Sequence, residues 1–341
     1  MVTMEPSAPI LRYIIVGKFT NDYLILPNNK NFNEIPGGSA FYSAAGLGLW
    51  DKDIGLIGIV NEDYPYEWIQ EANNRGIDIR GIQITSNYID QRNFIAYPSI
   101  NDPDFGNPIF HFSRIGEQFP KTLLGYGGNL TTNALKNDSK SIIKIKDIPF
   151  DYLDVTAVHI STLDYASQSR LPSFFRQGHA TTITLKAADD YMNTLYGDLV
   201  PTILKDITAF ICTEKQIRNL FYGKSSDLWD MVAELAVFGC EMIIIITDRN
   251  YFLLWDRTSR KKYEVPLYPS TIYDPTGLQD SFCGGFISGL RANQNPINAV
   301  LQGSISASFT VEGVGPFYCM DALPKLVQAR KEYLTSYVSE I

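Results

Sequence analysis

Four short apolar runs in the middle of the chain most constrain its fold. They are typical of strands that a parallel sheet buries on both faces, because their apolar residues are continuous rather than alternating. Segments with helical patterning lie between them, such as Asp227–Val237. This alternation predicts a doubly wound α/β fold with three α/β/α layers and a mostly parallel sheet. The runs are VTAVHI (155–160), TTITLK (181–186), ITAFIC (207–212) and EMIIIIT (241–247).

The N-terminal part predicts the start of the same sheet. Arg12–Gly17 and Asp53–Val60 are expected strands, and Gly38–Trp50 and Asp63–Arg75 are expected helices, which makes a β-α-β-α unit. The last third predicts a hairpin at Tyr251–Trp255 and Lys262–Val265, followed by three helices. These helices are expected at Ser281–Ala292, Pro296–Val311 and Leu323–Val338.

Two segments interrupt this pattern and predict a lid. Asn21–Leu26 and Asn31–Ile35 flank an Asn/Pro turn and favour a hairpin. Ile82–Ile115 contains alternating residues and turn residues, which predicts two or three strands and no helix. We therefore expect a single domain over residues 1–341 with lid strands at about 19–36 and 82–115. Apolar lid strands also allow a homodimer that pairs through the lid.

Composition excludes several classes of protein. The 341-residue chain is 45% hydrophobic and 19% charged, so a large core is expected. A net charge of −8 disfavours a nucleic-acid surface. No apolar stretch reaches the ~18 residues of a membrane span, and no export signal is evident, which predicts a cytoplasmic protein. Three histidines without ligand spacing make a zinc site improbable.

The stretch DPTGLQDSFCGGF (274–286) joins an expected strand end to a helix start. Ligands of open α/β sheets gather at that edge, and a helix N-terminus favours an anion. The carboxylate of Asp280 can accept a proton from a hydroxyl group, so the stretch suits phosphoryl transfer. Gly284 and Gly285 each cost a helix about 1 kcal/mol relative to Ala, which predicts close approach of a backbone or ligand. A plain reading remains, with Asp280 as an N-cap and Gly277 as a turn residue.

Three motifs together resemble the ribokinase-like (PfkB) carbohydrate kinase family. DPTGLQDSFCGGF resembles its D-T-x-G-A-G-D-x-F-x-G-G-F signature, GGSAFYSAAGLG its Gly-Gly motif, and VGKFTNDYLIL its opening strand with a substrate-binding Asp. Their order and separation also match, so the resemblance covers nearly the whole chain. It implies a ribokinase-like fold and an ATP-dependent phosphotransferase acting on a hydroxyl group of a sugar, nucleoside or related small molecule.

The resemblance also implies roles for individual residues. Asp280 matches the catalytic base, and the backbone of Gly277, Leu278, Gln279 and Asp280 matches the anion hole for the transferred phosphate. Asp22, Gly37, Gly38 and Tyr42 match substrate-binding positions, with the two glycines as the lid hinge. Cofactor-side positions match Asp274, Thr213, Gln216, Thr247 and Gly285. ATP and Mg²⁺ are the expected cofactors, with a monovalent cation near Asp274 as in some members, and no residue is assigned as a direct metal ligand.

Several positions depart from the family pattern. Gln279 stands where Gly is usual, and it would be strained if the backbone there needs a positive φ. Thr213 and Gln216 replace the Asn and Glu of the N-x-x-E motif, the turn after Thr247 lacks glycine, and Tyr42 replaces an Asn that helps to hold a ribose. Two hypotheses follow: an active kinase, or a catalytically weak or inactive relative that binds a small molecule or a protein.

Overall fold

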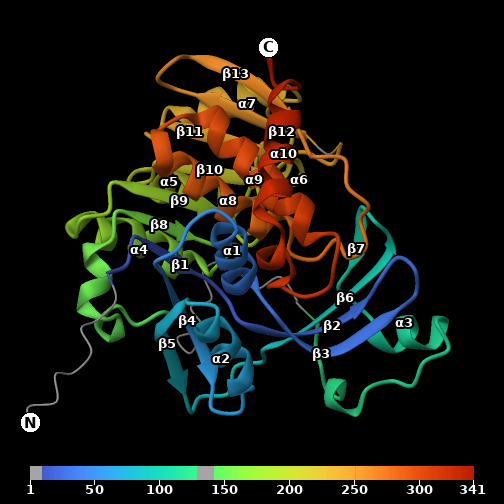
Figure 1. Cartoon of the computed structure of the whole chain (residues 1–341). Coiled ribbons are helices and arrows are strands. Elements are labelled where there is room, and N and C mark those ends of the chain that lie inside the picture. Colours follow the sequence, from blue (N-terminus) through green and yellow to red (C-terminus); the bar gives the residue numbers. More distant parts are fainter. Residues whose placement is uncertain (1–9, 129–141, 250) are drawn as a thin grey trace, which may run out of the picture.

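A computed structural model describes residues 10–128, 142–249 and 251–341. Its described residues form a ten-stranded central sheet with the order β14-β13-β12-β11-β10-β9-β8-β1-β4-β5 (Figure 1). Strands β11 to β5 in this order are parallel, and β12, β13 and β14 add antiparallel strands at one edge. The strands are β1 (Tyr13–Val16), β4 (Ile54–Asn61), β5 (Asp78–Thr85), β8 (Ala157–Ile160), β9 (Thr182–Lys186), β10 (Ala209–Thr213), β11 (Met242–Ile246), β12 (Tyr251–Asp256), β13 (Lys261–Pro266) and β14 (Ser339–Glu340).

Helices cover both faces of this sheet, which confirms the doubly wound three-layer prediction. Successive residues of one strand enter different cores: Ile15 packs in the cluster with α1, α2, α8, α9 and α10, and Ile14 packs in the cluster with α4, α5, α6 and α7. The first layer consists of α1 (Ser39–Gly48), α2 (Tyr66–Asn74), α8 (Leu278–Asn293), α9 (Pro296–Thr310) and α10 (Pro324–Thr335). The second consists of α4 (Tyr165–Gln177), α5 (Val200–Leu204), α6 (Glu214–Leu220) and α7 (Leu228–Ala236).

A separate four-stranded sheet lies beside the main body and forms the lid (Figure 1). Its order is β3 (Asn31–Gly37), β2 (Thr20–Ile25), β6 (Arg92–Ser99) and β7 (Asp102–Asp104). The β2–β3 pair is antiparallel, as the hairpin prediction required, whereas β2 and β6 are parallel. One apolar face of the lid packs on Tyr273 and Val314 of the main body. The other face packs on Phe112 of α3 (Pro108–Arg114).

The expectation of strands without a helix in Ile82–Ile115 was wrong in two respects. Residues 82–85 belong to β5 of the central sheet, where Ile82 pairs with Gly58 of β4. Residues 108–114 form helix α3, which begins after an Asn107 side chain that accepts from the Phe110 amide. Local alternation of apolar residues did not reveal either element. A seven-residue helix such as α3 has too few turns to show its period. A short 3₁₀ turn, Lys121–Leu123, follows α3.

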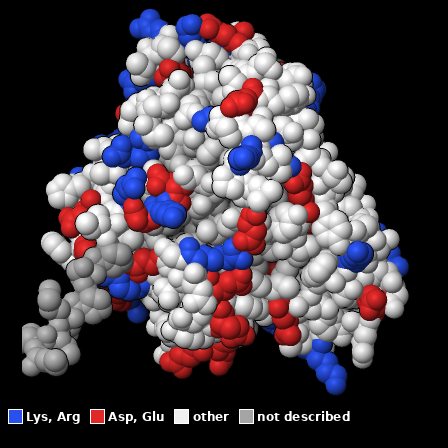
Figure 2. All heavy atoms as spheres, viewed as in Figure 1, with Lys and Arg blue, Asp and Glu red and all other residues white. Residues whose placement is uncertain are grey.

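Acidic and basic side chains are interspersed on the face shown in Figure 2, and no continuous basic stripe crosses it. Among the described residues, none of the helices combines the length and the apolar character that crossing a membrane requires. All four cysteines are buried and unpaired.

Candidate active site

The loop before α8 and the first turn of that helix form the centre of the site. Asp274 Oδ1 accepts a hydrogen bond from the Thr276 amide at 2.9 Å, which turns the chain tightly after Pro275. Gly277 follows in the left-handed conformation, with φ 77°, and is the residue that caps α8. Helix α8 therefore begins at Leu278 and not near Asp280, and Asp280 is an acid of the first turn rather than the N-cap. Glycine suits residue 277 because a left-handed backbone costs other residues energy.

The backbone amides of this turn are available to a ligand. Leu278 N–H donates to Pro275 O at 3.4 Å. The amides of Gly277, Gln279 and Asp280 have no hydrogen-bond acceptor in the part of the chain that the structure describes. Gln279 is helical and has no positive φ, so the strain considered for this position does not arise. Free amides at the positive end of a sixteen-residue helix are a suitable site for an anion.

Lys186 contacts Asp280, and the sequence did not indicate this pair. Lys186 is the last residue of β9, and its Nζ donates to Asp280 Oδ1 at 3.0 Å. The side chains are 10% and 18% exposed. Burial is the largest single effect on the pKa of the Lys186 ammonium and lowers it, but Asp280, Cys283 and Asp189 together outweigh burial, so the pKa is raised. The lysine that ends TTITLK was the available signal, because it lies at the sheet edge where α8 begins.

Asp22 and the glycines Gly37 and Gly38 meet where the lid joins the main body. The Asp22 carboxylate is buried and accepts hydrogen bonds from Thr20 Oγ1 at 2.6 Å and Asn93 Nδ2 at 3.0 Å. A Cβ atom on Gly37 would overlap this carboxylate, and Gly38 has a φ of 96° at the start of α1. Burial raises the pKa of Asp22 to about 6, although the two hydrogen bonds oppose the shift.

Tyr42 lies between these groups and the loop that precedes α8. Its ring lies where a Cβ atom on Gly277 would be, so the two residues are in direct contact. The ring is buried, and its hydroxyl group has no hydrogen-bond partner among the described residues. The pKa of Tyr42 is raised, mainly by burial and then by the charges of Asp274, Asp22, Tyr97 and Asp280. The structure thus brings Tyr42, Asp22, Asp274 and Asp280 into one electrostatic environment.

Asp274 is the second buried carboxyl group of the site. Burial raises its pKa to about 6, while hydrogen bonds from Thr276 oppose the shift. Its Oδ2 atom is buried without a partner in the described residues. An unpartnered buried carboxylate oxygen fits a small cation, because a charge buried without a counter-charge is costly. This is where the family resemblance predicts a monovalent cation.

The other residues expected on the cofactor side are Thr213, Gln216, Thr247 and Gly285. Thr213 and Gln216 form a capping box that starts α6, and Gln216 Nε2 also donates to Asp189 Oδ1 at 2.8 Å. Thr247 follows β11 and exchanges hydrogen bonds with the backbone of Tyr251.

Gly285 contacts α9, where a Cβ atom would overlap the Ser306 side chain and the Gln302 backbone. Gly284 meets α1 in the same way, so the glycine pair allows helix packing, as close backbone approach predicted.

The donors of the site fit a phosphate, since free amides and the ammonium of Lys186 converge on the first turn of α8. The described residues contain no group of three His, Cys, Asp or Glu side chains arranged to hold a metal ion.

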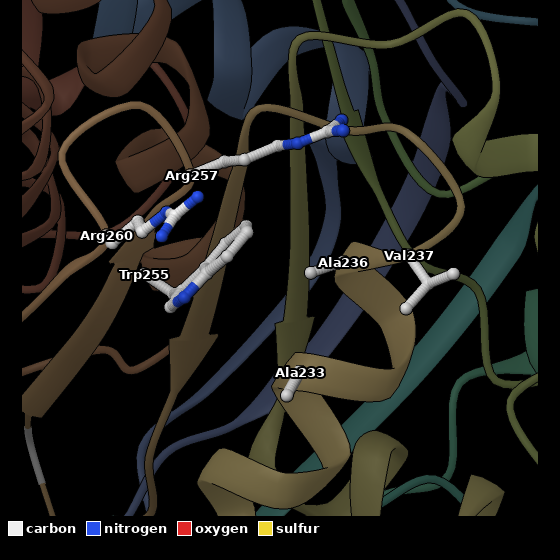
Figure 3. Close-up of a pocket in the computed structure, with 6 residues that line it drawn as sticks. All are labelled: Ala233, Ala236, Val237, Trp255, Arg257 and Arg260. Atoms are coloured by element: carbon white, nitrogen blue, oxygen red, sulfur yellow. The ribbon is translucent and has the colours of Figure 1, made fainter.

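Figure 3 shows a hollow away from this site, of about 390 Å³, between Trp255 of β12 and Ala236 of α7. Trp255 pairs with Ile243 near the start of β11, so this hollow lies at the opposite end of the strands from Asp280.

Comparison with known proteins shows similarity to sugar and nucleoside kinases. Residues 157–323 match the family described as pfkB family carbohydrate kinase. The cytidine kinase of Thermococcus kodakarensis is 25% identical over 282 residues, which cover 82% of this chain and 88% of the relative. The nucleoside kinase of Methanocaldococcus jannaschii has the same fold, with a TM-score of 0.64 at 18% identity over 96% of this chain and 100% of that one. Ribokinase of Arabidopsis thaliana, complexed with ribose and ATP, gives a TM-score of 0.69 at 14% identity over 94% of this chain and 99% of that one.

The fold is thus that of a ribokinase-like kinase with a lid. Residues 157–323, just under half of the chain, carry the match to pfkB family carbohydrate kinases, and the similar proteins include nucleoside kinases and a ribokinase. The predictions of family, fold class and enzyme class are confirmed.

Proposed function

We propose that this protein transfers the terminal phosphoryl group of ATP to a hydroxyl group of a nucleoside or a related sugar. The observation that carries the proposal is the position of Asp280, whose carboxylate lies beside three amides that have no acceptor among the described residues. A base and an anion site within one turn can serve both partners of a phosphoryl transfer. A nucleoside is the favoured acceptor, because the curated relative is a cytidine kinase.

Asp280 is the general base in this proposal. It accepts the proton of the attacking hydroxyl group as the new O–P bond forms and the bond to ADP breaks. The amides of Gly277, Gln279 and Asp280 donate to the equatorial oxygens of the phosphoryl group, whose negative charge they stabilise. Because the helix is already packed between α1 and α9, these donors need no reorganisation when the reaction occurs.

Asp22 and Tyr42 hold the acceptor. Asp22 is fixed by Thr20 and Asn93 and presents a carboxylate for substrate hydroxyl groups. The hydroxyl group of Tyr42, which has no partner among the described residues, is a second polar contact. The lid, which is hinged at Gly37 and Gly38, covers the acceptor and excludes water.

ATP is the donor in this proposal, and Mg²⁺ supplies neutralisation of the phosphate charge. Asp189 and Asp190 follow β9 and are the nearest carboxylates in sequence to Lys186, and Asp190 Oδ1 is buried without a partner among the described residues. We propose that these acids orient the hydrated metal ion, because Gln216 cannot provide the carboxylate of the usual motif. Asp274 Oδ2 is the proposed contact for a monovalent cation.

The first experiment measures nucleotide binding through stability. ATP with Mg²⁺ should raise the melting temperature of the native protein, because a ligand that binds only the folded state stabilises it. Phosphorylation of a panel of nucleosides and sugars then identifies the acceptor. Asp280→Asn should lower kcat by about 10²–10⁴-fold, the usual contribution of a general base, and should leave ATP binding in place.

Two outcomes would count against this function. The absence of any thermal shift at millimolar ATP would favour the non-catalytic alternative, a family member that only binds a small molecule or a protein. Full turnover by Asp280→Asn would remove the base from its role while leaving the kinase assignment intact. Asp230→Asn is a suitable control, because Asp230 lies in the first turn of a different helix, α7.

A further inference from the structure

Lys186 has donors that the observed structure does not use. An ammonium group carries three N–H donors, and in the described residues its one hydrogen bond goes to Asp280 Oδ1. The lysine side chain is only 10% exposed, so water satisfies little of the remainder. A buried cation with unused donors is costly unless a further anion completes its environment.

The pair also creates a conflict for the proposed base. The Lys186 ammonium lies 3.0 Å from Asp280 Oδ1 and donates to it. This contact occupies one of the two carboxylate oxygens that the base would use to accept the hydroxyl proton. The pair therefore suits the resting protein, and a change of partner by Lys186 would suit the reaction.

The first turn of α8, whose amides form the proposed anion site, lies next to this lysine. Asp280 contributes both the carboxylate that holds Lys186 and one of the unpartnered amides of the α8 first turn. A phosphoryl group on these amides would lie beside Asp280, within the neighbourhood of the Lys186 ammonium. Lysine is a common phosphate ligand in proteins because it is a compact point charge.

Two positions on the nucleotide side differ from the family motif, so a cation nearby would supply charge that they do not. Thr213 and Gln216 are engaged in capping α6, so they provide no charge to the phosphate site. Lys186 ends the neighbouring strand β9, which pairs with β10 just before Thr213. Lys186 therefore offers this sheet edge a positive charge from β9.

We propose that Lys186 exchanges partners during the reaction: it pairs with Asp280 in the empty site and with the transferred phosphoryl group when ATP is bound. This inference rests on the proposed kinase function and adds a residue to it. Lys186 remains protonated throughout. Its departure leaves Asp280 free to accept the hydroxyl proton, while the O–P bond to the acceptor forms and the O–P bond to ADP breaks.

The experiment compares ATP with ADP, because only ATP carries the group that Lys186 would bind. Calorimetric titrations with Mg²⁺ use the unsubstituted protein, Lys186→Met, Lys186→Arg and the exposed control Lys215→Met. We expect Lys186→Met to weaken ATP at least 10-fold and ADP less than 3-fold. Lys186→Arg should recover most of the loss, and Lys215→Met should change neither affinity.

A second comparison removes the effect of leaving Asp280 unpaired. Asp280→Asn and the double variant Asp280→Asn with Lys186→Met both lack that charge, so the comparison between them is free of its effect. The double variant should still lose ATP affinity at least 10-fold relative to the single one. An equal loss for ATP and ADP, or no loss, in a protein that binds ATP would overturn the role of Lys186 alone and leave a static ion pair. An unsubstituted protein that binds neither nucleotide would overturn the kinase function together with this inference.

Discussion

The hydroxyl group of Tyr97 lies 3.1 Å from Oγ1 of Thr276, and this hydrogen bond joins the lid to the loop that precedes α8. Tyr97 belongs to β6, and both residues are buried. The same lid face packs through Leu24 and Ile95 against the main body. One polar contact within an apolar contact area therefore connects lid position to the geometry of the proposed anion hole.

Tyr97→Phe should loosen the lid without unfolding the protein. The net value of one hydrogen bond is about 1 kcal/mol, so amide exchange in β6 should accelerate roughly 5-fold. The KM for the hydroxyl acceptor should rise more than kcat falls, because the substitution affects closure. Hydrogen-exchange mass spectrometry and steady-state kinetics test this, with the exposed Tyr222→Phe as control. Unchanged exchange in β6 would show that the apolar contacts alone hold the lid.

Tyr42→Phe should stabilise the ligand-free protein. Its hydroxyl group is buried without a partner in the described residues, and removing such a group recovers about 1–2 kcal/mol. The affinity for the acceptor should fall, because the same hydroxyl group is a proposed contact. Tyr13→Phe is the matched comparison: its hydroxyl group donates to Asp51 Oδ2 at 2.7 Å, so that variant should be less stable. Chemical unfolding of both variants gives the signs, and a loss of stability in Tyr42→Phe would contradict the assignment.

Gly277→Ala should be far more damaging than Gly315→Ala. Both glycines have a positive φ, of 77° and 87°, but the space around Gly315 is open, whereas the Tyr42 ring fills the space beside Gly277. Gly315→Ala should cost about 1–2 kcal/mol from backbone strain alone. Gly277→Ala should cost about 2–4 kcal/mol because overpacking is added. Unfolding free energies measure both costs. In a Tyr42→Ala background, which lacks the ring, the additional cost of Gly277→Ala should be smaller. Equal costs would show that the ring moves aside freely.

The stability of Asp22→Asn relative to the unsubstituted protein should increase as pH rises. The folded pKa of Asp22 is about 6, above its ordinary value of 3.8. The native state therefore binds more protons than the unfolded state between these values, and this contribution to stability is lost as pH rises through 6. Asn cannot ionise, so relative to the unsubstituted protein it should gain up to about 3 kcal/mol between pH 4 and pH 8. Urea unfolding at several pH values measures the difference, and a constant difference would show that the Asp22 pKa is not raised.

Most central strands and helices could be predicted because their signals are local. The run EMIIIIT became β11 (Met242–Ile246), and the last three expected helices became α8, α9 and α10 with shifts of a few residues at their ends. Residues 82–115 could not be assigned in this way. Whether Ile82 joins the lid or the central sheet depends on its pairing with Gly58, and local alternation is the same in both cases.

The apolar strands, the Gly277 turn and the acid at 280 could be read from local sequence, because backbone preference and hydrophobic period act over a few residues. Which side chains meet depends on the tertiary packing. Lys186 and Asp280 are 94 positions apart and form a pair because β9 ends where α8 begins. Tyr42 reaches Gly277 because α1 packs directly on α8, where Gly284 and Gly46 permit close contact. Such contacts depend on strand order and helix packing, which no short stretch of residues specifies.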